Sequence, residues 1–427
     1  MLDKEEINRI THTCSISNHP VSKLPMEIRE NYLQGLRAVL PMTNPYMKVL
    51  FKAWEDSILG KGQALSYNSN TTKEKVKTAI KLNRIGLRGF RLAYPFFFDC
   101  FYLSTICNNT GLIHAQYEQL IGYCNLITKK ALQRVYEYFK SGTLCNKIPI
   151  ELRNHRDLNL KFALAPLKRI LVVANVSAGK STLINALIGK RVNKIATTAC
   201  TKDLCYIFNK SQEEGLTIKQ RKTGEIVYES DANKCVSDEG EAIGLHFVSD
   251  LLKDKKICLI DTPGFNDAKV LNSRIITEKA IKENDFDVLI YVANGSYLER
   301  FDEQHLLGVV AQYSKKPIVF VINQLDRYDS EQDSIKNAIE DFKKDITSLG
   351  IKNPLIIPVS AKLALLIKLE NQNLLNTRDK KRLDDLKEWV AGSYYDLPTY
   401  VDFGYETPER PIYRTGLCCL EEIIQRL

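Results

Sequence analysis

The sequence predicts an α/β domain with a doubly wound, mostly parallel sheet, preceded by an all-helical N-terminal domain. Two observations support this fold class. Short apolar runs recur from residue 169 onward with enough residues between them for crossover helices, whereas residues 26–142 place apolar side chains at helical spacing. Because ligands of doubly wound sheets bind at the carboxyl ends of the strands, the residues that follow each run are the candidate site residues.

The N-terminal part is expected to be helical over residues 26–142, after a loose lead-in at 1–25 and before a linker at 143–167. Turn-forming residues at 15–20 favour the lead-in, and a mixture of Gly, Pro and charged residues favours the linker. Helices are expected at about 26–40, 45–59, 72–87, 92–107 and 112–139. Residues 168–427 then form the expected α/β domain.

Five apolar runs have the length and β-branched content of strands buried on both faces of a parallel sheet. They are RILVVA at 169–174, KICLI at 256–260, VLIYVA at 288–293, PIVFVI at 317–322 and LIIPV at 355–359. A turn containing one glycine and a helical run at 181–188 follow the first of them. Residues 363–411, with a charged helix and a Tyr/Pro-rich loop, are expected as a surface insertion, with a contact surface as the alternative.

The net charge of the chain is +9, from 60 Lys and Arg against 51 Asp and Glu in 427 residues. Residues 1–167 hold 23 basic and 13 acidic side chains, a difference of +10, which leaves 37 and 38, or −1, for the rest. The positive excess therefore belongs to the N-terminal part. Such an excess predicts an anionic partner for that part, whether phosphate, anionic lipid or an acidic protein surface.

Several classes of protein are excluded by the sequence. The charged N-terminus lacks the apolar core of a secretory signal. The most apolar stretch, at 92–107, has 16 residues where a bilayer-spanning helix needs about 20, so we expect a buried helix, with a membrane-dipping segment as the alternative. Eleven scattered cysteines without a CxxC pair suit free thiols in a reducing cytoplasm. Cys418 and Cys419 are expected as small residues of a final helix, in preference to a lipidation site.

The first apolar run leads into a G-x-x-x-x-G-K-[ST] pattern in which Ala174 replaces the first glycine. Such a loop wraps backbone N–H groups around phosphates at a helix N-terminus. Lys180 is expected to reach the β- and γ-phosphates, and the Ser181 hydroxyl to ligate Mg²⁺. The candidate phosphate-binding residues are Ala174, Asn175, Val176, Ser177, Ala178, Gly179, Lys180, Ser181 and Thr182.

Two further segments predict a metal and γ-phosphate site. Asp-Thr-Pro-Gly at 261–264 closes the second apolar run, where Asp261 would hold Mg²⁺ through a water and the Gly264 N–H would meet the γ-phosphate. Between the loop and this segment, Thr198 is the candidate switch threonine for Mg²⁺ and the γ-phosphate. The predicted metal ligands are therefore Ser181, Thr198 and Asp261.

Two segments at later strand ends predict recognition of guanine. Asn-Gln-Leu-Asp at 323–326 offers a carboxylate that accepts the ring N–H and exocyclic amino group of guanine, a donor pair that adenine lacks. Ser-Ala-Lys at 360–362 offers backbone N–H groups to the guanine carbonyl. Each motif alone could be a helix cap or a turn, but five in chain order argue against that alternative. The candidate base-binding residues are Asn323, Gln324, Asp326, Ser360, Ala361 and Lys362.

These motifs, with SAGKSTLINALIG at 177–189, resemble the bacterial dynamin-like GTPases of the dynamin superfamily. The resemblance covers about residues 168–365 and the closing helix at 415–427. It implies a P-loop GTPase domain that hydrolyses GTP to GDP and phosphate with Mg²⁺, using Ser177, Lys180 and Thr198 as catalytic residues. It further implies that Ser177 helps to hold a charge-compensating K⁺ or Na⁺ and to stabilise the transition state.

Three residues depart from the family pattern. Gln324 stands where a lysine is usual, so a stabilising charge near the base is lost. Phe265 stands where small signalling GTPases carry a glutamine that orients water, and Val176 replaces a polar loop residue of eukaryotic dynamins. A phenyl ring cannot orient water, so hydrolysis must use backbone groups, the cation or a residue from a partner. We therefore expect slow basal turnover that rises on self-association.

The resemblance implies a homo-oligomer or dimer formed through the GTPase face. Because the chain ends at Leu427, where dynamin-like proteins continue into a helical stalk, either residues 1–142 supply the partner surface or a second dynamin-like subunit does. A basic run at 73–91 followed by aromatics at 94–102 is consistent with an anionic membrane, or with a solvated helix beside a core helix. Nucleic acid is disfavoured because no RNA-binding module is present.

Two other functions remain open at this stage. One is an Era-like switch that acts on the ribosome or RNA, and the other is a GTP-binding scaffold with negligible hydrolysis. The expected location is the cytoplasm, either free or peripheral on the inner face of the membrane.

Overall fold

The computed structural model describes residues 2–66, 70–80, 92–108, 113–192, 203–221, 223–229, 242–265, 272–297, 301–401 and 411–427. The chain forms two compact units. The first comprises Met1–Leu164 with Glu225–Tyr228, and the second comprises Ala165–Gly224 with Glu229–Leu427.

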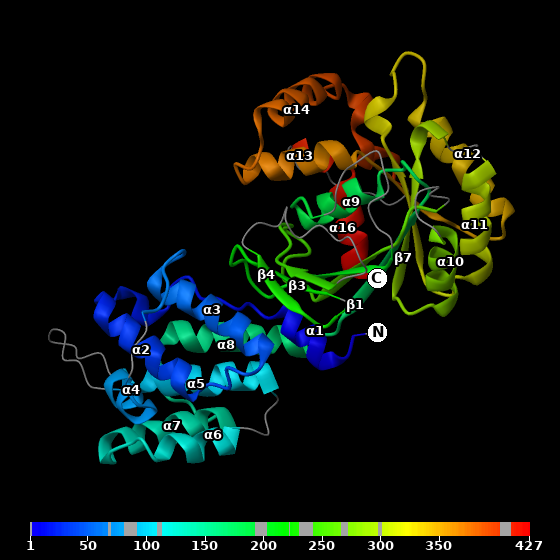
Figure 1. The fold of residues 1–427 in the computed structure, drawn as a ribbon. Helices are drawn as coiled ribbons and strands as arrows, with labels where there is room; N and C mark the ends of the chain where they lie inside the picture. Colours follow the sequence, from blue (N-terminus) through cyan, green and yellow to red (C-terminus); the bar gives the residue numbers. More distant parts are fainter. Residues whose placement is uncertain are drawn as a thin grey trace. The chain divides into compact units, whose positions relative to one another are not determined.

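The first unit is helical (Figure 1). Its helices are α1 (Lys4–Thr11), α2 (Met26–Val39), α3 (Pro45–Leu59), α4 (Thr72–Ala79), α5 (Ala93–Asn108), α6 (Ile113–Ile121), α7 (Leu126–Ser141) and α8 (Ile150–Leu164), with a 3-10 turn, η1, at Pro20–Lys23.

Three expectations for this unit were wrong in detail. The lead-in contains α1, which the Asp3 side chain caps in a capping box with Glu6. The linker contains α8, a helix of 15 residues. The single helix expected at about 112–139 is two helices, because the Asn125 side chain caps α7 by accepting from the N–H groups of Ile127 and Thr128. Side-chain caps, not apolar spacing, set the first residues of α1 and α7.

Helix α5 is the core of the helical unit, which confirms the expected buried helix. Phe96, Phe97, Phe98 and Phe101 are all fully buried. The one acidic residue within it, Asp99, is also buried and accepts hydrogen bonds from the Tyr32 hydroxyl at 2.6 Å and the His19 Nε2 at 3.1 Å. The aromatic stretch at 94–102 is therefore interior, and it does not form the membrane surface considered from the sequence.

No helix among the described residues combines the length and apolar content needed to cross a bilayer. The basic run at 73–91 lies partly outside the described residues, since 81–91 are not among them. Helix α4 carries Lys73 and Lys77 at exposed positions and Lys75 at a partly buried one.

The second unit is built on a twisted, mostly parallel sheet. Its strands are β1 (Lys168–Ala174), β2 (Cys205–Asn209), β3 (Thr217–Gln220), β5 (Ala242–Leu245), β6 (Ile257–Asp261), β7 (Val288–Asn294), β8 (Ile318–Asn323) and β9 (Leu355–Val359). They run in the order β3-β5-β2-β6-β1-β7-β8-β9. Strands β6, β1, β7, β8 and β9 are parallel, and β2 pairs antiparallel with β6. Strand β4 (Ile226–Glu229) falls mainly in the range grouped with the first unit.

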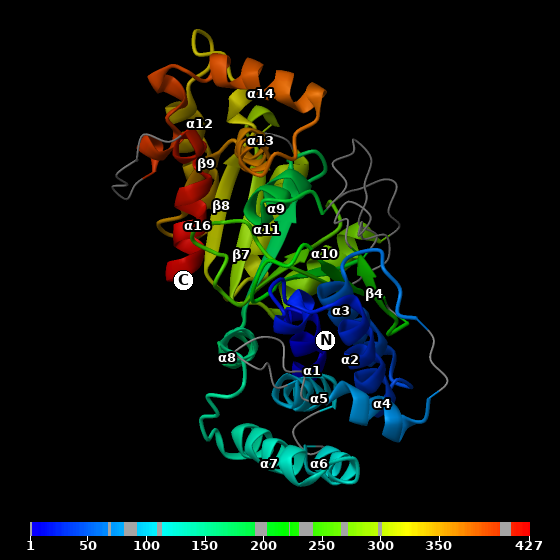
Figure 2. The same cartoon turned by 90° about the vertical axis from the view of Figure 1, so that its left-hand side faces the viewer.

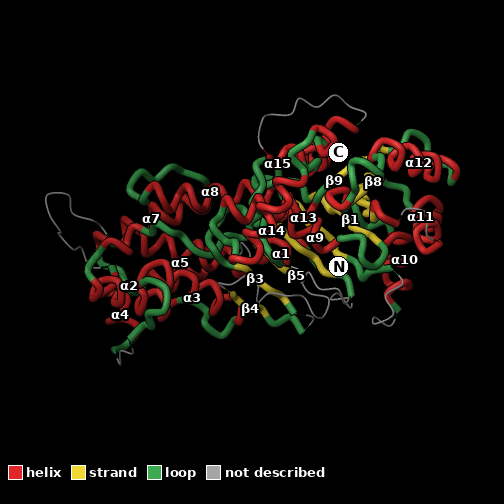
Figure 3. Tube along the Cα trace, turned by 90° about the horizontal axis from the view of Figure 1, so that it is seen from above, coloured by secondary structure: helices red, strands yellow, loops and turns green. Residues whose placement is uncertain are grey.

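Helices cover both faces of this sheet (Figures 2 and 3). One face carries α9 (Lys180–Ile188), α13 (Ala361–Asn371) and α16 (Leu417–Arg426). The other carries α10 (Ser273–Glu283), α11 (Phe301–Tyr313) and α12 (Ile335–Ser348). Helix α14 (Thr377–Trp389) packs on α13, and the short α15 (Pro411–Arg414) precedes α16. The predicted doubly wound α/β fold is confirmed.

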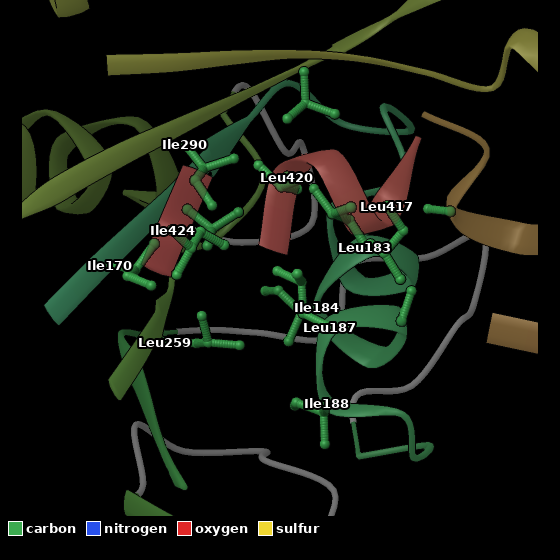
Figure 4. Packing of buried hydrophobic residues seen from close by; sticks show 14 of the residues in the cluster. Ile170, Leu183, Ile184, Leu187, Ile188, Leu259, Ile290, Leu417, Leu420 and Ile424 are labelled. Carbon is green, nitrogen blue, oxygen red and sulfur yellow. The ribbon is translucent and has the colours of Figure 1, made fainter. Parts of the chain in front are cut away.

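The apolar core beneath α9 and α16 fixes both helices against the central strands (Figure 4). Ile170 of β1 and Ile290 of β7 pack in one buried cluster with Leu187 of α9 and Leu420 and Ile424 of α16. On the opposite face of the sheet, the rings of Tyr291, Phe320 and Phe342 pack against one another. Because α9 and α16 are anchored this way, the loops before them are held at the carboxyl edge of the sheet.

Candidate nucleotide-binding site

The predicted phosphate loop joins the end of β1 to the start of α9. Two of its residues adopt the left-handed backbone conformation, Ser177 with φ 69° and Gly179 with φ 89°. A Cβ atom on Gly179 would lie 2.3 Å from the Asn323 Nδ2, so only glycine fits there. Ala174, in place of the usual first glycine, lies in the regular part of β1, and its carbonyl accepts the Phe265 N–H at 2.9 Å. Ala174 therefore belongs to the strand, and the left-handed residues of the loop lie after it.

Lys180 points to the end of the neighbouring strand β6. Its Nζ forms an ion pair with the Asp261 Oδ1, and the two side chains are 8% and 0% exposed. The ammonium thus lies on the carboxylate that is predicted to hold the metal. Asp261 and the Ser181 hydroxyl are hard oxygen donors, the kind that Mg²⁺ prefers beside phosphate oxygens, so these two residues fit a magnesium ion.

The segment after Asp261 is tied to the phosphate loop. The Thr262 hydroxyl donates to the Val172 carbonyl at 2.9 Å. A Cβ atom on Gly264 would lie 3.1 Å from the Val176 Cγ2, so the two loops are in close approach. The predicted Thr198 lies outside the described residues, as does the rest of 193–202. Among the residues that are described, no group of three or more His, Cys, Asp or Glu side chains could hold a metal.

Asn323, at the end of β8, links the phosphate loop to the base-recognition loop. Its Nδ2 donates to the Ala178 carbonyl at 3.0 Å, and its Oδ1 accepts the Ala361 N–H at 3.1 Å. Gln324 has a left-handed backbone with φ 71° and donates from Nε2 to the Ser177 carbonyl at 2.6 Å. Gln324, which replaces the usual lysine, therefore makes a second hydrogen bond between the base-recognition loop and the phosphate loop, in addition to that of Asn323.

Asp326 faces a small cavity at this edge of the sheet. Its Oδ1 accepts the Ser360 hydroxyl at 2.8 Å. The cavity has a volume of ≈ 140 Å³ and is lined by Gly179, Thr182, Asn323, Gln324, Asp326, Arg327, Lys362 and Arg382. Burial and, second, the nearby Arg382 guanidinium lower the pKa of Lys362. The cavity thus combines one carboxylate with several cationic side chains beside the phosphate loop. This combination suits a purine that presents hydrogen-bond donors on one edge and acceptors on another.

Phe265 follows the Asp-Thr-Pro-Gly segment, where small signalling GTPases are expected to carry a glutamine that orients water. The ring is fully buried and stacks on the His305 ring of α11, with centroids 5.5 Å apart and an interplanar angle of 26°. The Arg274 guanidinium of α10 lies 5.8 Å from its centroid, and Arg274 also donates to Glu278 at 2.8 Å. The Phe265 side chain is thus a packing element between the sheet and two helices.

The structure brings the predicted residues of the phosphate loop, β6, β8 and β9 to one edge of the sheet. Three neighbouring residues were missed. Asn294, at the end of β7, donates from Nδ2 to the Ser177 carbonyl at 3.2 Å, and its place at a strand end was a usable signal. Arg327 directly follows a predicted site residue. Arg382 comes from α14, and no motif marked it.

The domain has the features of a P-loop nucleotide-binding domain of the GTPase class. It carries a phosphate loop between a buried strand and a helix, a lysine–aspartate pair at the neighbouring strand end, and a small cavity lined by a carboxylate beside the loop. Residues 170–325 match the model of the dynamin family. This part of the chain is therefore similar to the dynamin family, and the chain is a dynamin-like GTPase.

Comparison with known proteins gives further relatives of this domain. The chain is 28% identical over 236 residues to the probable transmembrane GTPase FZO-like, chloroplastic, of Arabidopsis thaliana, covering 54% of this chain and 23% of that protein. It is 23% identical over 187 residues to GTPase Der of Campylobacter hominis, covering 44% and 32%. The chain thus spans about a quarter to a third of the length of these relatives.

A solved structure of an oligomerised bacterial dynamin pair, described as providing a mechanism for long-range sensing and tethering of membranes, also aligns with the chain. The alignment covers 99% of this chain and 60% of that one, with 14% identity and a TM-score of 0.38.

Proposed function

We propose that this protein hydrolyses GTP to GDP and phosphate with Mg²⁺. The observation that carries the proposal is the pairing of a phosphate loop with the Asp326 carboxylate across one small cavity. A carboxylate there accepts two hydrogen bonds from guanine, and adenine offers no such pair. The Ser360 hydroxyl, donating to Asp326 at 2.8 Å, fixes the orientation of the carboxylate before the base arrives.

In this proposal the chain positions the triphosphate through its backbone and Lys180. Lys180 would exchange Asp261 for the β- and γ-phosphates, which frees the carboxylate for the ion. Ser181 and Asp261, with Thr198 as the further predicted ligand, would hold Mg²⁺, which would supply positive charge that offsets the charge on the transferring group. Backbone N–H groups of the loop, including that of Gly264, are assigned to the γ-phosphate oxygens.

The attacking water needs a positioning group other than residue 265, because the Phe265 ring is packed on His305. We propose that nucleotide-dependent association through the GTPase face, either with a second copy or with another dynamin-like subunit, completes the site. The exposed Ser177 hydroxyl, which makes no hydrogen bond within the described residues, is assigned to a K⁺ or Na⁺ ion at this face. Basal turnover is then slow and rises with association.

Phosphate release from GTP, compared with ATP, tests this function. Wild-type protein should release phosphate from GTP in a Mg²⁺-dependent manner and ignore ATP, and Lys180→Ala should be inactive. Equal use of ATP would remove the role of Asp326. GTP binding without turnover, in K⁺ or Na⁺ and at every protein concentration, would instead support a GTP-binding scaffold.

We further propose that the helical unit contacts an anionic membrane from the cytoplasmic side. The supporting feature is the first turn of α7, where Leu126 is 83% and Ile127 62% exposed, followed at once by the exposed Lys129 and Lys130. An adjacent apolar pair beside two lysines fits the boundary between acyl chains and anionic headgroups. Free thiols in the core, such as Cys100, suit a reducing compartment.

Sedimentation with vesicles tests the membrane contact. Protein should pellet with vesicles that contain anionic lipid and much less with neutral ones. The double variant Leu126→Ser/Ile127→Ser should reduce pelleting, whereas Leu158→Ser, at an exposed leucine of α8, should not. Equal pelleting of all three proteins would rule this surface out, and binding to ribosomal RNA in its place would favour an Era-like switch.

A further inference from the structure

We propose that Arg382, from helix α14, binds the guanine base and supplies the positive charge that Gln324 lacks. The inference rests on the proposed GTP-binding function and deepens it by adding a base-binding residue from outside the predicted motifs. Arg382 lines the same cavity as Asp326 and Asn323, although 56 residues of chain separate it from Asp326.

The side chains around this cavity carry more positive than negative charge, which favours an electron-rich ligand. Asp326 is the one acidic side chain among the described lining residues, while Arg327, Lys362 and Arg382 are basic. Asp326 is hydrogen-bonded by the neutral Ser360. Within the described part of the chain, neither Lys362 nor Arg382 has a hydrogen bond or an ion pair, and the repulsion between them contributes to lowering the pKa of Lys362. The Asp379 and Asp326 carboxylates act on the pKa of Lys362 in the opposite direction. Two like charges that line one cavity without an ion pair between either of them and a described carboxylate favour a ligand that lies between or across them.

A packed helix, not a loose loop, presents Arg382. Leu383, the next residue, is fully buried in a cluster with Leu363 and Leu366 of α13. Asp379, one turn earlier, forms an ion pair with Arg191. The Lys387 ammonium lies 2.7 Å from the Glu370 carboxylate of α13. These contacts on both sides of Arg382 hold the helix, so the side chain starts from a fixed place at the cavity.

Gln324 cannot supply charge to the base, because its side chain is neutral and its Nε2 is bound to the Ser177 carbonyl. A guanidinium is planar, so it can stack on a purine face or donate two hydrogen bonds to the O6 and N7 acceptors of guanine. With Asp326 on the donor edge of the base, Arg382 would hold the remaining edge or face. The base is identical in GTP and GDP, so the contact strengthens both complexes equally.

Calorimetric titration of the full chain with GDP and with a non-hydrolysable GTP analogue tests this role. Arg382→Ala should weaken binding of both nucleotides about tenfold and by the same factor, raising KM for GTP while kcat stays unchanged. The matched control is Lys381→Ala, which removes an equal charge from the neighbouring exposed position outside the cavity. Lys381→Ala should bind both nucleotides as the wild type does.

Three outcomes would count against the role of Arg382, and a fourth would count against the proposed function. If Arg382→Ala binds within twofold of the wild type, or if Lys381→Ala loses as much affinity, Arg382 does not contact the base. If Arg382→Ala lowers kcat with KM unchanged, the side chain acts elsewhere. If the wild type binds neither nucleotide, the proposed function itself fails. An unchanged thermal unfolding transition in Arg382→Ala, expected for an exposed side chain, separates lost contact from lost fold.

Discussion

The ion pair between Lys180 and Asp261 makes a prediction about the nucleotide-free protein. Both side chains are buried, and the ammonium sits on the carboxylate that is assigned to Mg²⁺. Removing one member of a buried pair leaves the other without its counter-charge and costs about 3–5 kcal/mol, whereas replacing both costs much less. Lys180→Met and Asp261→Asn, alone and combined, therefore form a double-mutant cycle on the resting state of the site.

We expect Lys180→Met to lower the free energy of unfolding of the nucleotide-free GTPase domain by about 3 kcal/mol. The double variant should be more stable than the sum of the single effects predicts, by about 2 kcal/mol, because the two residues interact directly. Urea unfolding of the full chain measures these free energies. The transition that belongs to the GTPase domain is the one that saturating Mg²⁺ and GDP shift in the wild type. That ligand shift should be absent in both variants that lack Lys180.

Single effects that add within about 0.5 kcal/mol would refute the ion pair as an energetic contact. A control pair on the surface is available in Lys344 and Asp341, whose atoms lie 2.7 Å apart with both side chains exposed. Exposed pairs of this kind contribute at most about 1 kcal/mol, so the control cycle should show little coupling. The contrast between the two cycles isolates the effect of burial.

Three further predictions follow from the site and its surroundings. Asp326→Asn should weaken GTP binding about 10²-fold or more, and should favour xanthosine triphosphate, whose C2 carbonyl accepts from the new amide; competition between the two nucleotides measures this. Phe265→Gln should not raise basal phosphate release, because the new side chain would lie against His305, and it should lower the unfolding midpoint; a higher turnover would contradict the packing role. Burial lowers the pKa of His246 below its usual 6.5, so the native chain binds fewer protons than the unfolded one, and stability should fall as pH drops through 6.5 toward that lower pKa. Unfolding midpoints of His246→Gln should lose this slope.

The core of the GTPase domain was predictable because parallel strands buried on both faces have a plain signature. Runs ending at Ala174, Ile260 and Ile322 became β1, β6 and β8 within one or two residues. Their parallel order brings the residues that follow them to one edge. The described residues of the strand-end motifs therefore lie at one edge of the sheet, and their roles in nucleotide binding stay predictions.

Other parts had no such signature. The capping box of Asp3 and the cap at Asn125 are short polar patterns that also occur in turns, so α1 and the break between α6 and α7 were missed. Arg382 reaches the base cavity only because Leu383 anchors α14 on α13, a tertiary contact that no local pattern encodes. Asp99 lies buried within the apolar helix α5 because it accepts hydrogen bonds from His19 and Tyr32, two contacts that the local sequence does not encode.

The excess of positive charge in the N-terminal part still predicts an anionic partner there, but the proposed contact surface differs from the one considered from the sequence. Aromatic residues after the basic run are interior, so they cannot anchor a membrane. The exposed Leu126 and Ile127, next to Lys129 and Lys130, replace them as the proposed contact. The apolar content of residues 94–102 could not decide between a buried helix and a membrane contact, because the same aromatic stretch can form either. The packing of the side chains distinguishes the two.

GTP turnover per subunit, measured across a wide range of protein concentration with Mg²⁺ and K⁺, tests the central claim most directly. A slow GTP-specific rate should rise steeply as subunits associate, and Lys180→Ala should stay inactive at every concentration. A rate per subunit that does not change with concentration would contradict completion of the site by a partner copy. The absence of any GTP turnover would contradict the enzyme.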